Sequence, residues 1–255
     1  MVQDQILLND WHVIARSQDL QPGTVQHKRL LGSDLVLWHN GDKVLAWQDL
    51  CPHRGARLSL GYVNKQTLVC SYHGLAFNSE GKCILAPANP DQSPPARACV
   101  KTYQLLERYD LLWVCLGTPK QDIAPFSEWD DPVYRKIFCG PYHYHSSPLR
   151  ALENFIDKLG PGEHRLNVFY TITPVDEDEC VAQYWLMVNS AREIPVEVYL
   201  NIQNLVASQD IAIVNSQQPR RLPLDLQAEV HLPSDRYSIA YRQLLKQQGI
   251  TFGTI

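Results

Sequence analysis

The fold of this chain is decided by Cys51-Pro-His-Arg-Gly55 and, further along, by Cys70-Ser-Tyr-His-Gly74. Each stretch offers one thiol and one imidazole, Cys51 with His53 and Cys70 with His73, close enough in sequence to share one loop. A glycine follows each histidine, and a residue without Cβ lets the backbone of such a loop fold tightly. Two loops of this kind can bring four metal-ligating side chains to one place.

Two Cys and two His form the ligand set of a Rieske [2Fe–2S] centre, in which two thiolates hold one iron and two imidazoles hold the other. Neutral imidazoles in place of two thiolates raise the reduction potential into a range suited to single-electron relay. Zinc is the alternative, because it binds the same two residue types. Zinc sites usually pair like with like, whereas here C-x-H precedes C-x₂-H. The pattern therefore favours the iron–sulfur centre.

The composition is that of an ordinary globular protein. The chain has 255 residues, of which 45% are hydrophobic, and this is enough for one large domain or two smaller ones. Its formal net charge of −4 gives no electrostatic reason to expect nucleic acid or an anionic membrane as a partner. The start Met1-Val-Gln-Asp-Gln5 lacks the basic and apolar regions of a signal peptide. No apolar stretch approaches the length of a membrane span.

The cysteines indicate a reducing compartment. Seven are present, and the five outside the two motifs are scattered without a disulfide-like spacing. Several stand in apolar, strand-like surroundings, as Cys115 does in Leu111–Gly117, where a free thiol behaves as a small hydrophobic residue. We therefore expect a cytoplasmic protein with free thiols.

Up to about residue 120 the sequence predicts short strands separated by turn signals. Asn40-Gly41 between two apolar runs is a strong signal for a hairpin. The strands are expected at 11–15, 24–31, 34–38, 43–48, 67–70, 100–106 and 111–116. Such regular, short strands predict an all-β domain over residues 1–120, with the two motif loops projecting from neighbouring hairpins. Prolines and acidic residues in the following stretch predict a connector over residues 121–145.

The remainder, residues 146–255, mixes helices and strands. Helices are expected at 148–157, 197–215 and from Ser234 to Gly249, and strands at 167–173 and 181–187. The fold class is therefore α+β, with an all-β domain first and a mixed domain after it.

With these motifs together, the sequence resembles the oxygenase component of the Rieske non-haem iron oxygenases, and most closely their cyanobacterial branch with the saxitoxin-pathway hydroxylases. The stretches that carry the resemblance are the two motif loops and 67–74, 107–117, 128–132, 153–157, 215–219 and 233–242. The resemblance implies a Rieske domain that passes electrons to a mononuclear Fe(II) in a C-terminal helix-grip domain. There O₂ is activated and a small organic substrate is hydroxylated or demethylated, as in monooxygenases and dioxygenases of this kind.

The resemblance also implies where a mononuclear iron would bind. The family motif is Asn-x-x-Asp-x-x-His-x₄-His, and Asn154 and Asp157 match its first half. The position of the first His is occupied by Gly160, and His164 is the only histidine nearby. Asp210 matches the third, carboxylate ligand of the facial triad. Asp210 and His164 are thus the candidate iron ligands, with Asp210 as a surface helix residue the alternative.

The C-terminal part is shorter than the family pattern. The family carries several strands between the Asn-x-x-Asp helix and the equivalent of 169–175, and here that stretch is nearly absent. We therefore expect an internal deletion around residues 158–168 and a shortened helix-grip domain. The resemblance makes Asp157 a catalytic bridge to a Rieske histidine of a neighbouring subunit, and so implies a homotrimer. A simple helix-end carboxylate is the alternative for Asp157.

Three functions follow. The first is an oxygenase that receives electrons from a separate ferredoxin or ferredoxin reductase, since the chain has no dinucleotide-binding glycine-rich turn. The second is a degenerate relative that keeps the [2Fe–2S] centre, lacks a functional mononuclear iron and only transfers electrons. The third is an interaction module stabilised by zinc.

Overall fold

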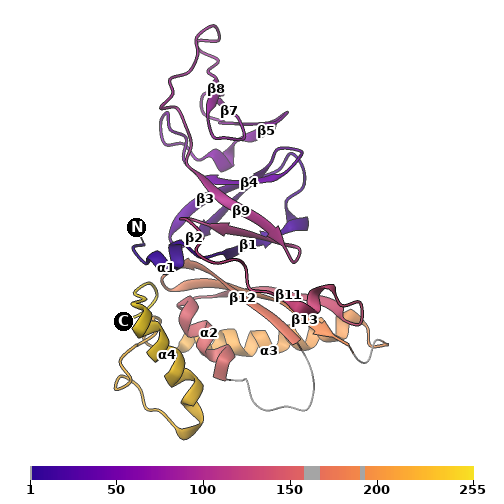
Figure 1. Cartoon of the computed structure of the whole chain (residues 1–255), viewed down its shortest axis with the longest axis vertical. Coiled ribbons are helices and arrows are strands. Elements are labelled where there is room, and N and C mark those ends of the chain that lie inside the picture. Colours follow the sequence, from indigo (N-terminus) through magenta and orange to yellow (C-terminus); the bar gives the residue numbers. More distant parts are fainter. Residues whose placement is uncertain (1, 158–166, 190–192) are drawn as a thin grey trace. The chain divides into compact units, whose positions relative to one another are not determined.

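The computed structural model of the chain describes residues 2–157, 167–189 and 193–255, and it separates into two compact units (Figure 1). The N-terminal unit comprises residues 7–121, and the C-terminal unit comprises residues 2–6 and 122–255. Each unit has its own sheet and its own buried core. None of the helices in the described part is long and apolar enough to cross a membrane.

The N-terminal unit consists of two antiparallel sheets. One has six strands in the order β1-β10-β9-β4-β3-β2, and the other has four in the order β5-β6-β7-β8. The strands are β1 (His12–Arg16), β2 (Val25–Leu30), β3 (Ser33–His39), β4 (Val44–Gln48), β5 (Tyr62–Asn64), β6 (Thr67–Val69), β7 (Ala76–Phe77), β8 (Cys83–Leu85), β9 (Thr102–Arg108) and β10 (Leu111–Cys115). Short helical turns are α1 (Gln5–Leu8), where the two units meet in sequence, η1 (Ser17–Asp19) and η2 (Leu58–Leu60).

The hairpin predicted at Asn40-Gly41 is present between β3 and β4. The Asn40 side chain accepts the backbone N–H groups of Asp42 and Lys43 at 2.9 and 2.8 Å. Gly41 has a φ of +106°, which a residue with a Cβ rarely adopts. The turn therefore fixes the register that places Trp38 opposite Leu45.

The main core of this unit lies directly under the two motif loops. It includes the motif cysteines themselves, together with Val36, Trp38, Trp47, Leu58, Leu68, Phe77, Cys83 and Val100. Trp38 and Trp47 meet edge to face with their ring centroids 4.8 Å apart. Because Cys51 and Cys70 are part of the packed core, their Cα positions are set by the same contacts that stabilise the sheets.

The C-terminal unit is a three-stranded antiparallel sheet with helices packed on it. The sheet order is β11-β13-β12, so the central strand is β13. Its elements are η3 (Ser127–Asp130), β11 (Arg135–Tyr144), α2 (Pro148–Asp157), β12 (Asn167–Asp176), β13 (Glu179–Val188), α3 (Val196–Ser216), η4 (Pro233–Asp235) and α4 (Arg236–Gln248). The long helix α3 lies along the sheet (Figure 1) and packs on β11, while α2 contacts α3, α4, β12 and β13.

The fold class predicted from the sequence, α+β with an all-β part followed by a mixed part, is confirmed. One segment differs in detail, because residues 135–144 of the expected connector form strand β11. Ile137 and Cys139 on this strand are buried, and β11 pairs with β13 along its length. Pro141 is accommodated where the ladder is interrupted, between Cys139 and Tyr142. The prolines that indicated a connector end at Pro132, before the strand begins.

Candidate functional site

The first motif loop is closed by its own backbone. The N–H of Cys51 donates to the carbonyl of Ala56 at 2.8 Å, and the N–H of Gly55 donates to the carbonyl of Cys51 at 2.9 Å. Gly55 has a φ of +73°, so the turn that brings these groups together depends on a residue without a Cβ. His53 lies at the tip of this loop and is exposed.

The second motif loop repeats the same closure. The N–H of Cys70 donates to the carbonyl of Leu75 at 2.9 Å, and the N–H of Gly74 donates to the carbonyl of Cys70 at 2.9 Å. Gly74 has a φ of +70°, and a Cβ there would come within 3.0 Å of the Pro87 side chain. The glycine is therefore needed both for the turn and for the close approach of Pro87.

The four motif side chains come together with the thiols inside and the imidazoles outside. Cys51 and Cys70 are 3% and 1% exposed, whereas His53 and His73 are exposed and their ring centroids lie 4.7 Å apart. Burial, with the neighbouring Cys70 thiol adding to it, raises the pKa of Cys51 to about 11. Bound iron would supply the positive charge that holds such thiols as thiolates. Two buried sulfur donors beside two exposed nitrogen donors fit a [2Fe–2S] cluster with mixed ligation.

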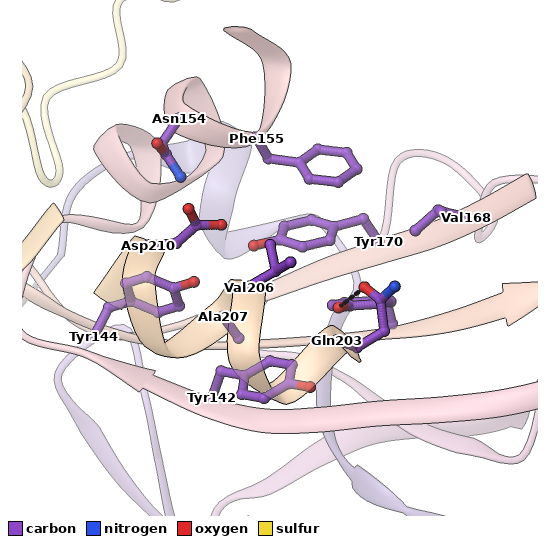
Figure 2. Close-up of a pocket in the computed structure, with 11 residues that line it drawn as sticks. Tyr142, Tyr144, Asn154, Phe155, Val168, Tyr170, Gln203, Val206, Ala207 and Asp210 are labelled. Atoms are coloured by element: carbon purple, nitrogen blue, oxygen red, sulfur yellow. Dashed lines mark hydrogen bonds between the residues drawn. The ribbon is translucent and has the colours of Figure 1, made fainter. Parts of the chain in front are cut away.

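A second candidate site is a cavity of about 380 Å³ in the C-terminal unit (Figure 2). It lies between α2, α3 and the sheet, and its walls are largely aromatic. The residues that line it are Tyr142, Tyr144, Asn154, Phe155, Val168, Tyr170, Tyr184, Gln203, Val206, Ala207 and Asp210. Phe155 stacks on Tyr170 with centroids 4.0 Å apart, and Tyr170 stacks on Tyr184 at 5.5 Å. A volume of this size suits a small organic molecule.

The side chains of Asp210 on α3 and Asn154 on α2 point toward one another at one end of this cavity (Figure 2). The phenols of Tyr144 and Tyr170 lie close to them. Burial first, and the charge of Asp210 second, raises the pKa of Tyr144 to about 12. Burial also raises the pKa of Tyr170. Both phenols therefore stay protonated near neutral pH and can donate a hydrogen bond.

Sequence reasoning placed Asp210 and Asn154 together, and both line the cavity. Asp157 ends α2, and its side chain falls outside the described part of the structure, as does His164. The four tyrosines were not anticipated. The signal for two of them was the alternation Tyr142-His-Tyr144 on one strand, which puts both phenols on the same face.

The described lining of the cavity does not fit a mononuclear iron. It contains one carboxylate, Asp210, and no histidine. His143 alternates with the two cavity tyrosines on β11, so its side chain is directed to the other face of the sheet. Within the described part of the C-terminal unit, no three His, Cys, Asp or Glu side chains form a group that could hold a single metal ion. A facial triad requires three protein ligands, and only Asp210 is placed to be one.

Comparison with known protein families covers both units. The family model for the Rieske [2Fe-2S] domain matches residues 10–104, and the model for the vanillate O-demethylase oxygenase C-terminal domain matches residues 125–249. The chain belongs to the Rieske non-haem iron oxygenases. In this family the [2Fe–2S] centre is carried by the N-terminal of the two matched domains.

Individual Rieske oxygenases match at moderate identity. The methylxanthine N1-demethylase NdmA of Pseudomonas putida is 34% identical over 169 residues, or 60% of this chain and 48% of that protein. This chain thus spans about half the length of that curated relative. The solved structure of an NdmA variant of Pseudomonas putida CBB5 with theobromine has a TM-score of 0.84 at 25% identity, over 95% of this chain and 90% of that chain.

One relative bears on the length of the chain. The methylxanthine N3-demethylase NdmB of Pseudomonas putida is 25% identical over 297 residues, which take in 87% of this chain and 82% of that protein. An alignment of 297 positions is longer than the 255 residues of this chain. This chain therefore lacks residues that NdmB has within the aligned region.

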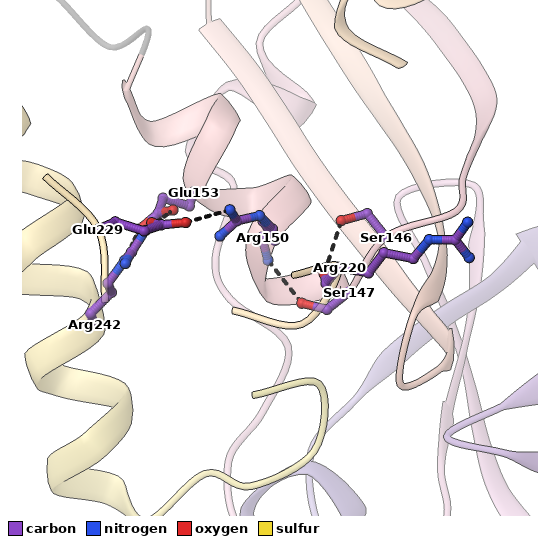
Figure 3. Close-up of polar contacts among 7 residues, drawn as sticks. All are labelled: Ser146, Ser147, Arg150, Glu153, Arg220, Glu229 and Arg242. Atoms are coloured by element: carbon purple, nitrogen blue, oxygen red, sulfur yellow. Dashed lines mark hydrogen bonds and ion pairs between the residues drawn. The ribbon is translucent and has the colours of Figure 1, made fainter. Parts of the chain in front are cut away.

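A buried network of charges fixes α2, which carries one wall of the cavity (Figure 3). Arg242 of α4 donates its Nε–H and an Nη2–H to Glu153 of α2 at 2.6 and 2.8 Å. Glu229 accepts from Nη2 of Arg242 and from Nη2 of Arg150, both at 2.6 Å. Arg150, Glu153 and Arg242 are 3–6% exposed. Two cations and two anions thus neutralise one another where α2 meets α4. One of them, Glu153, directly precedes the cavity residue Asn154 in the sequence.

The first turn of α2 is tied down separately (Figure 3). The Ser147 hydroxyl accepts the backbone N–H of Arg150 at 3.1 Å, which satisfies one of the unpaired N–H groups at a helix start. The backbone N–H of Ser147 and the hydroxyl of Ser146 both donate to the carbonyl of Arg220, at 3.0 and 3.2 Å. The segment that follows α3 therefore anchors the start of α2.

Replacing Arg242 by leucine is expected to destabilise the protein by about 3–5 kcal/mol, because Glu153 would remain buried without a cation. Urea unfolding followed by circular dichroism measures this at pH 7. Lys246→Leu, an exposed position on the same helix, is the control and should change the free energy of unfolding by no more than about 0.5 kcal/mol. Equal stabilities of wild type and Arg242→Leu at neutral pH would contradict the role of the network.

The network also predicts the direction of the pH dependence. Burial alone would raise the pKa of Glu229, but its hydrogen bonds with Arg150 and Arg242 outweigh burial and hold the pKa below the ordinary value of 4.5. The unfolded chain therefore binds the proton more tightly than the folded protein. The stability that ionised Glu229 adds to the folded protein is present above pH 4.5, and it is lost as the pH falls through the lowered pKa of the folded state. The stability difference between wild type and Arg242→Leu should shrink in that acidic range.

Proposed function

We propose that this chain is the oxygenase component of a Rieske system, in which a [2Fe–2S] centre relays single electrons for O₂-dependent hydroxylation or demethylation of a small organic substrate. The observation that carries the proposal is the pair of matching loops, each with a buried Cys and an exposed His. Membership in the Rieske oxygenases supports it, as does the cavity in the C-terminal unit.

The roles of the four motif residues follow from their burial. Cys51 and Cys70 would hold the inner iron as thiolates, inside the core that Trp38 and Phe77 help to form. His53 and His73 would hold the outer iron. The cluster supplies a one-electron centre at a potential raised by its neutral imidazole ligands. Because both imidazoles are exposed, an electron can enter or leave through them from a separate partner, such as a ferredoxin or ferredoxin reductase.

The substrate would bind in the cavity of the C-terminal unit. Stacked Phe155, Tyr170 and Tyr184 offer an aromatic wall, and the Gln203 side chain, which accepts a hydrogen bond from the Tyr184 hydroxyl at 2.8 Å, adds a polar group. The relatives NdmA and NdmB are demethylases of methylxanthines by their names. A small organic molecule, demethylated or hydroxylated, is the corresponding substrate class here.

Assembly into a ring is part of the proposal. If Asp157 bridges to a Rieske histidine of a neighbouring copy, the protein should elute as a homotrimer, with three times the chain mass of 29.1 kDa. Size-exclusion chromatography with light scattering measures this directly. Asp157→Ala should then slow substrate turnover with the reduced electron donor, while the content of [2Fe–2S] cluster per chain stays the same. A strict monomer at micromolar concentration would remove the proposed route between subunits.

A second candidate function is electron transfer without a mononuclear iron. It is favoured by the described lining of the cavity, where Asp210 is the single candidate ligand. NdmB also has residues within the aligned region that this chain lacks. His164, the remaining candidate from the sequence, lies outside the described residues. The two candidate functions differ in the iron that the chain holds beyond its cluster.

Metal analysis of the anaerobically purified protein tests the proposal. The expected preparation is red-brown, holds two iron and two sulfide per chain, and gives a Rieske electron paramagnetic resonance signal when it is reduced. Its visible absorption should bleach on reduction with dithionite and return in air. A colourless protein that retains stoichiometric zinc would overturn both candidate functions and leave the zinc module.

A further inference from the structure

A buried carboxylate lies two residues before the first cluster cysteine. Asp49 is 4% exposed, and both of its oxygens accept hydrogen bonds from one residue, Ser59. Oδ1 accepts the backbone N–H of Ser59 at 2.7 Å, and Oδ2 accepts its hydroxyl at 2.6 Å. The backbone N–H of Asp49 donates to the carbonyl of Asp34 on β3 at 3.0 Å. Asp49 is therefore fixed to the sheet by its backbone and to η2 by its side chain.

The two hydrogen bonds from Ser59 to Asp49, called the clamp below, span the first motif loop. The second loop connects β6 and β7, which pair with each other, so the strand ladder itself sets the width of that loop. The first loop leaves β4, whose partners are β3 and β9, and runs into η2. No ladder joins the segments that flank this loop, and besides the loop's own backbone bonds, the two hydrogen bonds from Ser59 to Asp49 tie them together. These two bonds therefore restrain the segments on either side of Cys51 and His53.

The carboxylate also brings charge close to the site. Oxygen–oxygen distances near 2.6 Å are typical of a hydroxyl that donates to a charged acceptor. A negative charge buried near the cluster acts through a medium of low dielectric constant, where it is weakly screened. Adding an electron to the cluster next to such a charge is disfavoured. The charge of Asp49 should therefore lower the reduction potential of the cluster.

We propose that Asp49 is a positioning residue of the [2Fe–2S] site, which holds the Cys51 and His53 loop in place through Ser59 and sets the reduction potential through its charge. The proposal rests on the cluster proposed above for the two motif loops. The hydrogen bond and the charge can be tested separately, because an asparagine at position 49 keeps an acceptor for the Ser59 N–H and removes the charge.

Three variants test it by iron and sulfide content and by a redox titration followed by electron paramagnetic resonance. Asp49→Asn should keep the cluster and shift its potential upward. Ser59→Ala, which keeps the charge and loses the bond to the hydroxyl, should show no upward shift. Asp49→Ala loses the clamp and should retain the cluster about 10- to 100-fold less firmly against a chelator. Asp19→Asn, an exposed position with the same change in net charge, should match wild type.

Each result is decisive. Wild-type cluster retention and potential in both Asp49→Asn and Asp49→Ala would overturn the proposal. An equal upward shift in Asp49→Asn and Asp19→Asn would overturn the role of the buried charge, because any surface charge would then have the same effect. A wild-type protein with no cluster would overturn the proposed function and this inference together, whereas a wild-type cluster indifferent to Asp49 would overturn this inference alone.

Discussion

Cys70→Ser is expected to abolish the [2Fe–2S] cluster and its electron paramagnetic resonance signal, leaving a colourless protein. The Cys70 thiol is 1% exposed and is packed in the core under both loops, so no solvent ligand can take its place. Serine supplies a hard oxygen donor where the cluster requires a soft thiolate. Iron and sulfide content per chain, measured after anaerobic purification, should fall from two of each to none.

The control for this experiment is Cys99→Ser, which changes an exposed cysteine of the same unit. It should keep the full iron and sulfide content. Cys70→Ser should also lower the melting temperature, because the free energy of metal binding contributes to folding. Loss of the cluster from both variants alike would show that it depends on overall stability rather than on Cys70. Full retention by Cys70→Ser would remove this residue from the ligand set.

Iron added beyond the cluster is expected to be held loosely, and oxygenase turnover is expected to be slow. Asp210 is the single described side chain of the cavity able to act as a strong iron ligand, and a site with one or two protein ligands loses iron readily. The measurement is iron content after reconstitution with Fe(II) and brief treatment with a chelator that spares the cluster. Two iron atoms per chain should remain, in wild type and in Asp210→Ala.

The opposite result is equally informative. A third iron that survives the chelator in wild type, and is lost in Asp210→Ala or His164→Ala, would show that the C-terminal unit forms a working iron site. Turnover with chemically reduced ferredoxin should then depend on the same two residues. His143→Ala is the control, because His143 is directed away from the cavity tyrosines. It should leave both iron content and turnover unchanged.

The N-terminal unit could be predicted closely from the sequence because its signals are local. Turn residues such as Asn40-Gly41 and alternating apolar residues fixed most of its strands within one or two positions. The expected strand at 100–106 begins two residues later, as β9 (Thr102–Arg108). Strands β5, β7 and β8 were missed because two or three residues carry no readable alternation. They form through pairing with neighbours, which a local pattern does not show.

The C-terminal site was less predictable for a physical reason. Asp210 and Asn154 were recognised from a family pattern, but the cavity walls depend on contacts between distant segments. Tyr170 and Tyr184 meet because β12 and β13 pair in one particular register, and Phe155 joins them from a helix. The charge network likewise joins Glu153 to Arg242 across 89 residues of sequence. Neither the register nor the helix packing can be read from composition or periodicity.

The twin backbone closures of the motif loops have a consequence for how the cofactor is acquired. Each loop is held by two N–H···O bonds of 2.8–2.9 Å between its own residues, above a core of tryptophan and phenylalanine. These bonds should keep the two loops closed when iron is removed, unlike a small zinc finger, whose fold depends on its ion. Chelated protein should accordingly regain its colour from iron and sulfide without being unfolded first.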